Sequence, residues 1–127
     1  MRLLIDTQAI LCFQGSDEKL TNAAKKMILD KGNTCFISIA SLWEIAIKIN
    51  LNKLNIGIAF DDFQDYLITN DFKILGLEFS HLKKLSTLDN YHKDPFDRLI
   101  IAQAMYEDLV IISSDRHFTE YPINLIW

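Results

Sequence analysis

The chain has 127 residues, of which 50% are hydrophobic and 24% are charged, and its formal net charge is -4 at pH 7. This length suits one domain with a sizeable core, and this composition excludes a disordered or fibrous protein. The acidic total argues against a general nucleic-acid coat protein, because such proteins use basic surfaces to replace the counterions around phosphate. It does not exclude an enzyme that meets phosphate through a bound cation.

The compartment is indicated by the cysteines and the N-terminal segment. Cys12 and Cys35 lie in apolar contexts without the C-x-x-C spacing of a zinc ribbon, so we expect neither a disulfide scaffold nor a zinc site. The N-terminal apolar run meets Asp6 too early for a secretory signal, and no run approaches the ~18 residues of a membrane span. The sequence therefore predicts a soluble, cytoplasmic protein.

Apolar runs and helical periodicities alternate along the chain. The first predicted strand covers residues 2–5 and stops at Asp6, where a helix follows. The next predicted elements, in chain order, are a helix over 20–31, a strand over 34–37, helices over 38–51 and 60–68, a strand over 72–75, helices over 80–88 and 94–106, and strands over 109–112 and 123–126. Strands that are apolar throughout and alternate with helices predict one α/β domain, with a mostly parallel sheet covered on both faces.

Acidic residues gather at one edge of this predicted sheet. Asp6 and Asp115 each come directly after a strand, and Glu44 and Asp97 lie in the first turns of helices that start at the same edge. In open parallel sheets the ligand crevice lies outside the carboxyl ends of the strands. Two carboxylates ~4 Å apart repel by roughly 4 kcal/mol at an effective dielectric of 20, so the cluster needs protons or cations. Oxygen ligands without a nearby His–Cys set favour Mg²⁺ or Mn²⁺.

Each acid also has a structural explanation of its own. These are capping of a helix or turn for Asp6, Asp94 and Asp115, complementation of a helix dipole for Asp97, and a capping box with Ser41 or an ion pair with Lys48 for Glu44. The coincidence of four acids at one edge favours a phosphodiesterase site with one or two metal ions. There a metal can activate water and neutralise phosphate charge.

Four segments, in order and in register, resemble the PIN-domain ribonucleases, specifically the VapC-like toxins of bacterial type II toxin–antitoxin pairs. They are LLIDT at 3–7, SLWEIAIK at 41–48, HKDPFDRLIIAQA at 92–104 and SSDRHF at 113–118, and the ending INLIW at 123–127 is also similar. The resemblance implies a three-layer α/β/α domain over residues 1–127. It further implies Mg²⁺- or Mn²⁺-dependent endonuclease cleavage of RNA by an activated water.

Carried over position by position, the resemblance implies that Asp6, Glu44, Asp97 and Asp115 are the catalytic and metal-binding acids. Asp6 and Asp97 are the strongest candidates for direct metal ligands, whereas Glu44 could orient the water and Asp115 could act through a bound water or complete a second metal site. Thr7 and Ser113 match positions where the family usually has a hydroxyl that supports the acids. Asp94 is expected to cap its helix.

The basic residues near these motifs are candidates for holding RNA phosphates. Arg116, Arg98 and Lys48 are the ones we consider, and Arg116 is the first to test because it directly follows an acid. A catalytic role for His92 or His117 is not needed if one metal site is intact. Trp43, between apolar neighbours, is expected to lie in the core rather than to stack on a base.

The resemblance also implies partners, because VapC-like toxins are usually homodimers neutralised by a small antitoxin that lies in a groove and blocks the acidic site. The apolar and amphipathic helices between residues 20 and 68 are candidate walls for that groove. Ordinary core packing would give the same pattern.

Three other interpretations stay open. The first keeps the fold but assigns a nuclease of RNA processing or of DNA that is not a toxin, and the second is a catalytically idle PIN module that only binds a partner. The third is a receiver-like phosphoacceptor domain, which the chain matches poorly because it lacks an early acidic pair and any lysine beyond Lys93.

Overall fold

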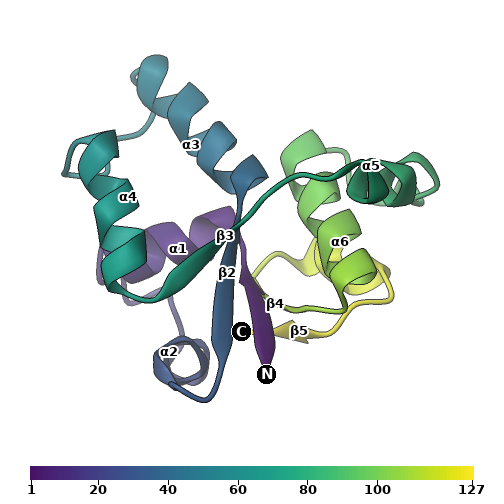
Figure 1. The fold of residues 1–127 in the computed structure, drawn as a ribbon, viewed down its shortest axis with the longest axis horizontal. Coiled ribbons are helices and arrows are strands. Elements are labelled where there is room, and N and C mark those ends of the chain that lie inside the picture. Colours follow the sequence, from purple (N-terminus) through teal and green to yellow (C-terminus); the bar gives the residue numbers. More distant parts are fainter.

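Five parallel strands form one sheet in the order β3-β2-β1-β4-β5 (Figure 1). This arrangement comes from a computed structural model that describes residues 1–127. The strands are β1 (Arg2–Ile5), β2 (Thr34–Ser38), β3 (Phe72–Leu75), β4 (Val110–Ile112) and β5 (Leu125–Ile126). Every neighbouring pair runs parallel. The predicted α/β class with a mostly parallel sheet is therefore confirmed.

Six α-helices and one 3-10 helix connect or follow the strands. They are α1 (Thr7–Gln14), α2 (Asn22–Leu29), α3 (Ile39–Asn50), α4 (Phe60–Thr69), α5 (Phe79–Ser86), α6 (Pro95–Glu107) and η1 (Arg116–Glu120). The ends predicted from the sequence agree with these to within about two residues, the usual uncertainty of an element boundary. None of the helices combines the length and the apolar character needed to cross a membrane.

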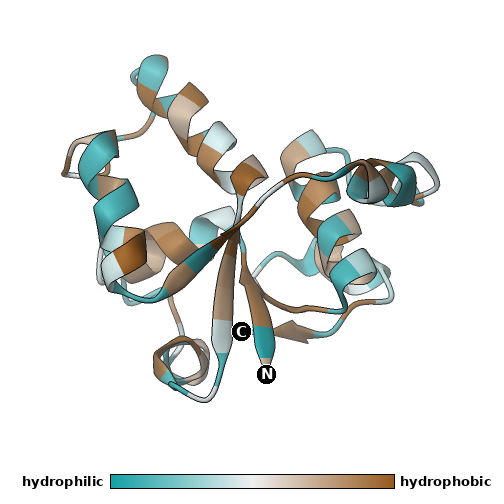
Figure 2. Ribbon diagram, viewed as in Figure 1, coloured by the Kyte–Doolittle hydropathy of each residue, from teal (hydrophilic) through white to brown (hydrophobic).

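The central strand β1 faces two hydrophobic cores, one on each side of the sheet. Leu3 and Ile5 pack into a core that α1, α2, α3 and α4 complete, whereas Leu4 points to a second core built from α6 and η1. Successive side chains of a strand point to opposite faces, so an apolar strand must be covered twice. Figure 1 shows α1, α2, α3 and α4 on one side of the sheet and α6 on the other, and Figure 2 shows brown, apolar stretches along the strands between them. The predicted three-layer α/β/α fold is confirmed.

The strand order reverses next to β1, where the chain turns from β2 and β3 on one side to β4 and β5 on the other. The Asp6 N–H donates to the Ile112 carbonyl at 3.1 Å and so ties the carboxyl ends of β1 and β4 together. Open α/β sheets bind ligands at this edge beside such a reversal. The N-terminal ends of α3 and α6 lie at the same edge, because α3 follows β2 directly and α6 runs back across the sheet into β4.

Candidate active site

Two of the predicted acids stand at the carboxyl ends of neighbouring strands. Asp6 follows β1 and is 5% exposed, and its Oδ1 accepts a hydrogen bond of 2.7 Å from the Ala9 N–H at the start of α1. Asp115 follows β4, and its Oδ1 accepts from the His117 N–H at 2.9 Å. Both acids therefore cap the turn after their strand, as the structural alternatives predicted. Capping engages one oxygen of each carboxylate, so the other oxygen can still face the site and accept a hydrogen bond or bind a metal ion.

Glu44 reaches the site from α3, which Ser38 caps at the end of β2. Its carboxylate is almost buried and forms an ion pair of 2.9 Å with Lys48 Nζ, one turn further along the helix. The predicted capping box with Ser41 is wrong, because Ser38 is the capping residue and Ser41 lies inside the helix. There the Ser41 hydroxyl accepts a buried hydrogen bond of 2.9 Å from the Thr7 hydroxyl.

Asp97 comes from the first turn of α6, which begins as the sequence predicts. Asp94 is the N-cap, and its Oδ1 accepts from the N–H groups of Phe96 and Asp97 at 2.9 and 3.1 Å. Pro95 fills the first helical position, where a missing N–H costs nothing. Asp94 is thus occupied in starting the helix, and Asp97 is the acid of this motif that turns into the site.

The helices that carry Glu44 and Asp97 are joined through one buried polar contact. Gln103 of α6 is fully buried, its side-chain Oε1 accepts from the Ser38 hydroxyl, and its Nε2 donates to the Gly76 carbonyl at 3.2 Å. Ser38 in turn caps α3 through the Ala40 N–H. This contact fixes the start of α3 against α6, and with it the separation of the two acids. Sequence reasoning missed Gln103, although a polar residue inside an apolar helical run was the available signal.

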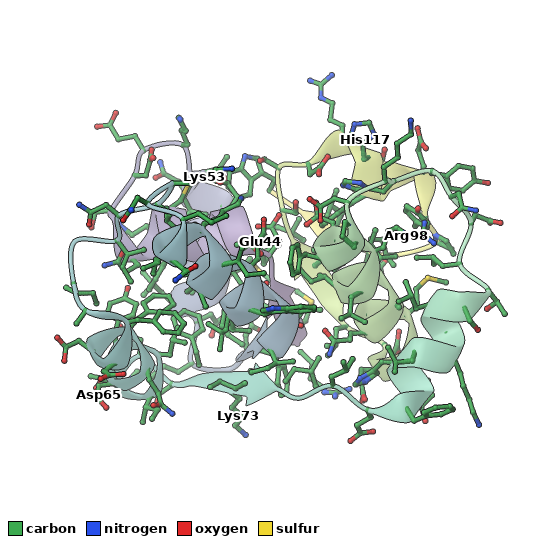
Figure 3. All side chains as sticks on the ribbon, turned by 90° about the horizontal axis from the view of Figure 1, so that it is seen from above. Glu44, Lys53, Asp65, Lys73, Arg98 and His117 are labelled. Atoms are coloured by element: carbon green, nitrogen blue, oxygen red, sulfur yellow. The ribbon has the colours of Figure 1, made fainter.

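All four predicted acids line one pocket. Its walls are formed by Asp6, Thr7, Gln8, Leu11, Glu44, Lys48, Asp97, Ser114 and Asp115. In the view from above, Glu44 lies on the side of α3 that faces α6 (Figure 3). The predicted convergence of the four carboxylates is therefore what the folded chain presents.

The surroundings of this pocket disfavour the charged form of two of the acids. Burial raises the pKa of Asp6 to about 6, with smaller contributions from the charges of Asp115 and Glu44, although the Ser113 hydroxyl and the Ala9 N–H oppose the rise. Burial is also the main cause that raises the pKa of Asp97 to about 7, and the nearby charge of Asp94 adds to it. Hydrogen bonds alone thus leave the cluster with uncompensated negative charge.

A divalent cation would supply the missing charge. The pocket offers carboxylate oxygens from four different segments, and the two acids whose charge is most disfavoured, Asp6 and Asp97, both line it. Mg²⁺ and Mn²⁺ prefer such oxygen donors. The residues present therefore fit a hard divalent cation.

One histidine stands among these acids. The His92 Nε2 lies 3.0 Å from Asp97 Oδ2 and 3.0 Å from Asp115 Oδ2. The sequence indicated His92 as a basic residue that could contact RNA phosphate or act as an acid or base, and it did not place His92 between two of the acids. Its loop, between α5 and α6, has no periodicity from which a contact could be predicted.

Comparison with known proteins decides the family. The family model described as PIN domain matches residues 3–124. The chain belongs to the PIN domain family. No curated protein matches it in sequence.

Solved structures show the same PIN fold. A DNA-bound VapBC complex from Salmonella typhimurium superposes with a TM-score of 0.74 at 16% identity, covering 99% of this chain and 97% of that one. VapBC2 from Rickettsia felis, bound to a promoter DNA fragment, superposes with a TM-score of 0.68 at 18% identity, covering 99% of this chain and 98% of that one. A sarcin-ricin loop cleaving toxin from Mycobacterium tuberculosis superposes with a TM-score of 0.68 at 11% identity, covering 95% of each chain. The resemblance expected from the four motifs is confirmed.

The hydroxyl groups that the PIN resemblance singled out have different partners. Ser113 hydrogen-bonds the Asp6 carboxylate and accepts from the Asp115 N–H at 3.0 Å, so it links two acids. Thr7 donates to Ser41 and thereby joins α1 to α3. Ser113 therefore contacts the acids directly, whereas Thr7 acts on the position of α3.

The three basic residues named for RNA contact also differ in this PIN domain. Lys48 lines the acidic pocket. Arg116 is exposed beside Asp115. The Arg98 guanidinium donates to the carbonyls of the loop before α6, including those of Asp89 and His92 at 2.9 and 3.2 Å, and lies on the far side of α6 from Glu44 (Figure 3). The geometry thus gives Arg98 a role in holding this loop.

Trp43 does not lie in the core, and that prediction was wrong. Its side chain is 59% exposed and meets Phe96 edge-on, with ring centroids 5.1 Å apart. The apolar neighbours of Trp43 face the sheet, but position 43 lies on the part of α3 that turns toward α6. Trp43 precedes Glu44 and Phe96 precedes Asp97, so the aromatic pair borders the acidic pocket.

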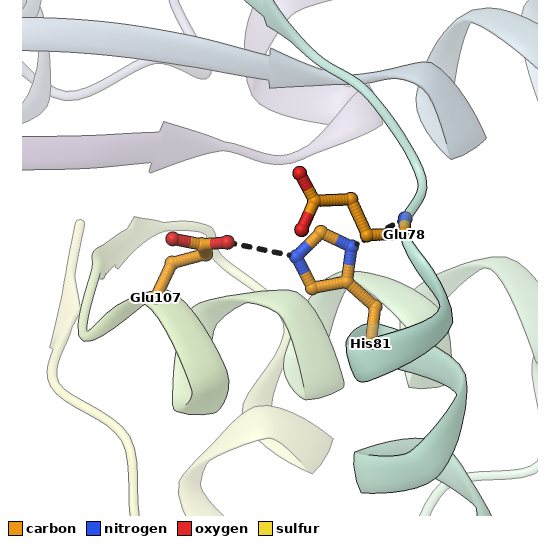
Figure 4. A group of neighbouring side chains, drawn as sticks. All are labelled: Glu78, His81 and Glu107. Carbon is orange, nitrogen blue, oxygen red and sulfur yellow. Dashed lines mark hydrogen bonds and ion pairs between the residues drawn. The ribbon is translucent and has the colours of Figure 1, made fainter.

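A second cluster of potential metal ligands lies between α5 and α6 (Figure 4). His81 is fully buried, its Nδ1 accepts from the Glu78 N–H at 3.0 Å, and its Nε2 lies 3.0 Å from Glu107 Oε1. Both ring nitrogens are thus engaged, with the proton on Nε2. This histidine joins the two helices and has no free lone pair for a metal.

Proposed function

We propose that this PIN domain is a metal-dependent endoribonuclease that hydrolyses phosphodiester bonds and acts as the toxin of a toxin–antitoxin pair. The observation that carries the proposal is the pocket where Asp6, Glu44, Asp97 and Asp115 meet at the carboxyl edge of the sheet. The raised pKa values of Asp6 and Asp97 support it, because they mark a site where an added positive charge is favoured.

Asp6, Asp97 and Glu44 would hold Mg²⁺ or Mn²⁺, with Asp115 at the side of the site. The cation, when bound, supplies activation of water and neutralisation of phosphate charge. Asp6 is held for this task by the Ala9 N–H and the Ser113 hydroxyl. Lys48 sits at the pocket wall, where its ammonium group can bind the phosphate backbone of RNA.

Arg116 extends the basic side of the site along η1. It is exposed, and it directly follows the acid at the end of β4. An arginine in this place offers a bidentate contact to a phosphate. Local positive charge of this kind compensates for the net charge of -4 that would otherwise repel RNA.

An antitoxin segment would lie in the groove between α3 and α4. The groove is lined by Ile39, Leu42, Trp43, Ala46, Phe60, Asp61, Phe63, Gln64, Leu67 and Ile74, most of which are apolar. The solved structures with this fold include toxin–antitoxin complexes from several bacteria. Trp43 belongs to the groove and is adjacent to Glu44, so a segment seated here reaches the edge of the acidic pocket. Such an antitoxin would block RNA as it binds.

The remaining parts of the proposal concern assembly and compartment. We infer that residues 1–127 form one nuclease domain that acts as a homodimer in the cytoplasm, where the two cysteines stay reduced. Both are free and buried, Cys12 on α1 and Cys35 on β2. A nuclease of RNA processing or of DNA would use the same acids, and it differs from a toxin in its substrate and in having no neutralising partner.

Controlled expression in growing bacteria tests the toxin assignment. We expect induction of the wild-type chain to stop growth and to produce discrete RNA fragments, while Asp6→Asn does neither. Asp62→Asn, which removes an exposed acid of α4 outside both the acidic pocket and the groove, is the matched control and should behave as the wild type. Growth arrest with intact RNA, or equal toxicity of Asp6→Asn, would contradict the assignment.

A further inference from the structure

The position of His92 bears on how many metal ions the acidic site can hold. Its Nε2 is 3.0 Å from one carboxylate oxygen of Asp97 and 3.0 Å from one of Asp115. These two oxygens and the nitrogen all lie within 4.8 Å of one another. The ring therefore occupies the place between the two acids.

The other ring nitrogen decides which role His92 can play. The Asp94 N–H donates to His92 Nδ1 at 3.2 Å, so Nδ1 carries a lone pair and the proton is on Nε2. Moving that proton to Nδ1 would set two N–H groups against each other. Nε2 therefore acts as a donor toward the carboxylates of Asp97 and Asp115, and its lone pair is not available to a metal ion.

The ring is also held firmly in this place. The His92 N–H donates to the Tyr121 hydroxyl at 2.8 Å, and its carbonyl accepts from Arg98 Nη1 at 3.2 Å. The imidazole packs beside Phe118, with ring centroids 5.7 Å apart, and the side chain is only 11% exposed. Backbone and ring contacts together make His92 a fixed donor.

We propose that His92 is a positioning residue that holds Asp97 and Asp115 together and restricts the acidic site to one metal ion. A cation shared by these two carboxylates would lie about 2 Å from an oxygen of each. The Nε2 proton lies at about the same distance from both oxygens, so it fills that position. The single ion is then left to Asp6, Glu44 and the free oxygen of Asp97. This inference rests on the proposed function, because it takes the acidic site to be a metal site.

Counting bound Mn²⁺ tests the proposal without any RNA. Calorimetric titration should give one ion per wild-type chain, and the electron paramagnetic resonance spectrum should be that of an isolated ion. For His92→Ala we expect two ions per chain and the spectrum of a coupled pair, because two metals in such sites lie about 4 Å apart. His92→Gln keeps an N–H donor at similar reach and should stay at one ion.

His117→Ala is the matched control, because its ring lies 5.1 Å from that of His92 and the hydrogen bond of His117 to Asp115 comes from the backbone N–H, which alanine keeps. It should bind one ion as the wild type does. Two ions per wild-type chain would overturn the inference, as would weaker binding of one ion by a folded His92→Ala, which would make His92 a ligand. If His92→Ala does not fold, the wild-type spectrum decides, since an isolated ion supports the inference and a coupled pair overturns it.

Failure of this inference is distinguishable from failure of the proposed function. A wild-type chain that binds two ions and cleaves RNA would overturn the inference alone. A wild-type chain that binds no Mn²⁺ would overturn both.

Discussion

Asp6 and Asp97 are the residues on which the proposed chemistry depends most, because their surroundings disfavour the charged carboxylate that would bind a metal ion. Burial is the first cause for both, and neighbouring acids add to it. Each unit of pKa shift corresponds to about 1.4 kcal/mol between the two protonation states. The folded chain therefore stores free energy in this pocket that a bound cation can release.

The raised pKa values of Asp6 and Asp97 predict how the stability of the protein depends on pH. The pKa values of about 6 and about 7 in the folded chain lie above the ordinary value of 3.8, so the folded form binds more protons than the unfolded form between these values. The free energy of unfolding of metal-free protein should fall by roughly 2–4 kcal/mol as the pH rises from about 4 to about 7. Urea unfolding over this range measures it. Saturating Mg²⁺ should flatten the fall, and a rise without metal would contradict the account.

Substitution of Asp97 separates the metal-site role from a role in the helix dipole. We expect Asp97→Asn to be as stable as the metal-free wild type or slightly more stable at pH 7, because it removes repulsion, while RNA cleavage is lost. If Asp97 only complemented the dipole of α6, the change would cost a few tenths of a kcal/mol and spare activity. Asp61→Asn, in the first turn of α4, shows the size of the dipole effect alone.

At the scale of elements, the sequence was most informative where periodicity and capping agree. Strand β1 could be predicted because its apolar run ends at an acid. Helix α6 could be predicted because Asp94–Pro95 starts a long run of apolar residues at helical spacing. Contacts between elements could not be predicted in the same way. Trp43 was placed in the core from its neighbours, but the packing of α3 against α6 leaves it at the rim.

The four acids could be predicted as a cluster because the topology of a parallel sheet brings strand ends and helix starts to one edge. His92 could not, because it lies in a loop whose path depends on the Tyr121 hydroxyl, 29 residues away in sequence, and on side-chain contacts of Arg98 that no periodicity indicates. The uncompensated charge on Asp97 likewise depends on burial, which a sequence pattern does not measure.

The contact between α3 and α6 gives a prediction at this scale. Gln103→Leu should lower the free energy of unfolding by roughly 1–3 kcal/mol, because it leaves the buried Ser38 hydroxyl without its acceptor and the Gly76 carbonyl without its donor. Denaturant unfolding measures the change. Gln64→Leu on the exposed face of α4 should stay within about 0.5 kcal/mol of the wild type. Equal stability of the two variants would show that the contact does not hold the helices.

For the whole molecule, the site lies where the strand order reverses, and the apolar groove between α3 and α4 opens beside it. α3 contributes to both, with Glu44 in the acidic pocket and Trp43 in the groove. In the proposed function, a protein segment bound in the groove would therefore block the acidic pocket without any change of shape.

Replacement of Trp43 tests this placement of the segment. We expect Trp43→Ala to weaken binding of the proposed antitoxin by at least about tenfold, as for a central aromatic residue of an interface, while RNA cleavage by the free protein persists. Phe79→Ala removes the still more exposed aromatic of α5, outside the groove, and should leave antitoxin affinity unchanged. Unchanged affinity of Trp43→Ala would place the antitoxin elsewhere.

The most direct test of the central claim is the cleavage of total cellular RNA by purified, antitoxin-free protein. The four-acid site predicts discrete fragments with Mg²⁺ or Mn²⁺, none with EDTA, restoration when the metal is added back, and none with Asp6→Asn. Cleavage that persists with EDTA or with Asp6→Asn would contradict a metal-dependent site built on these acids.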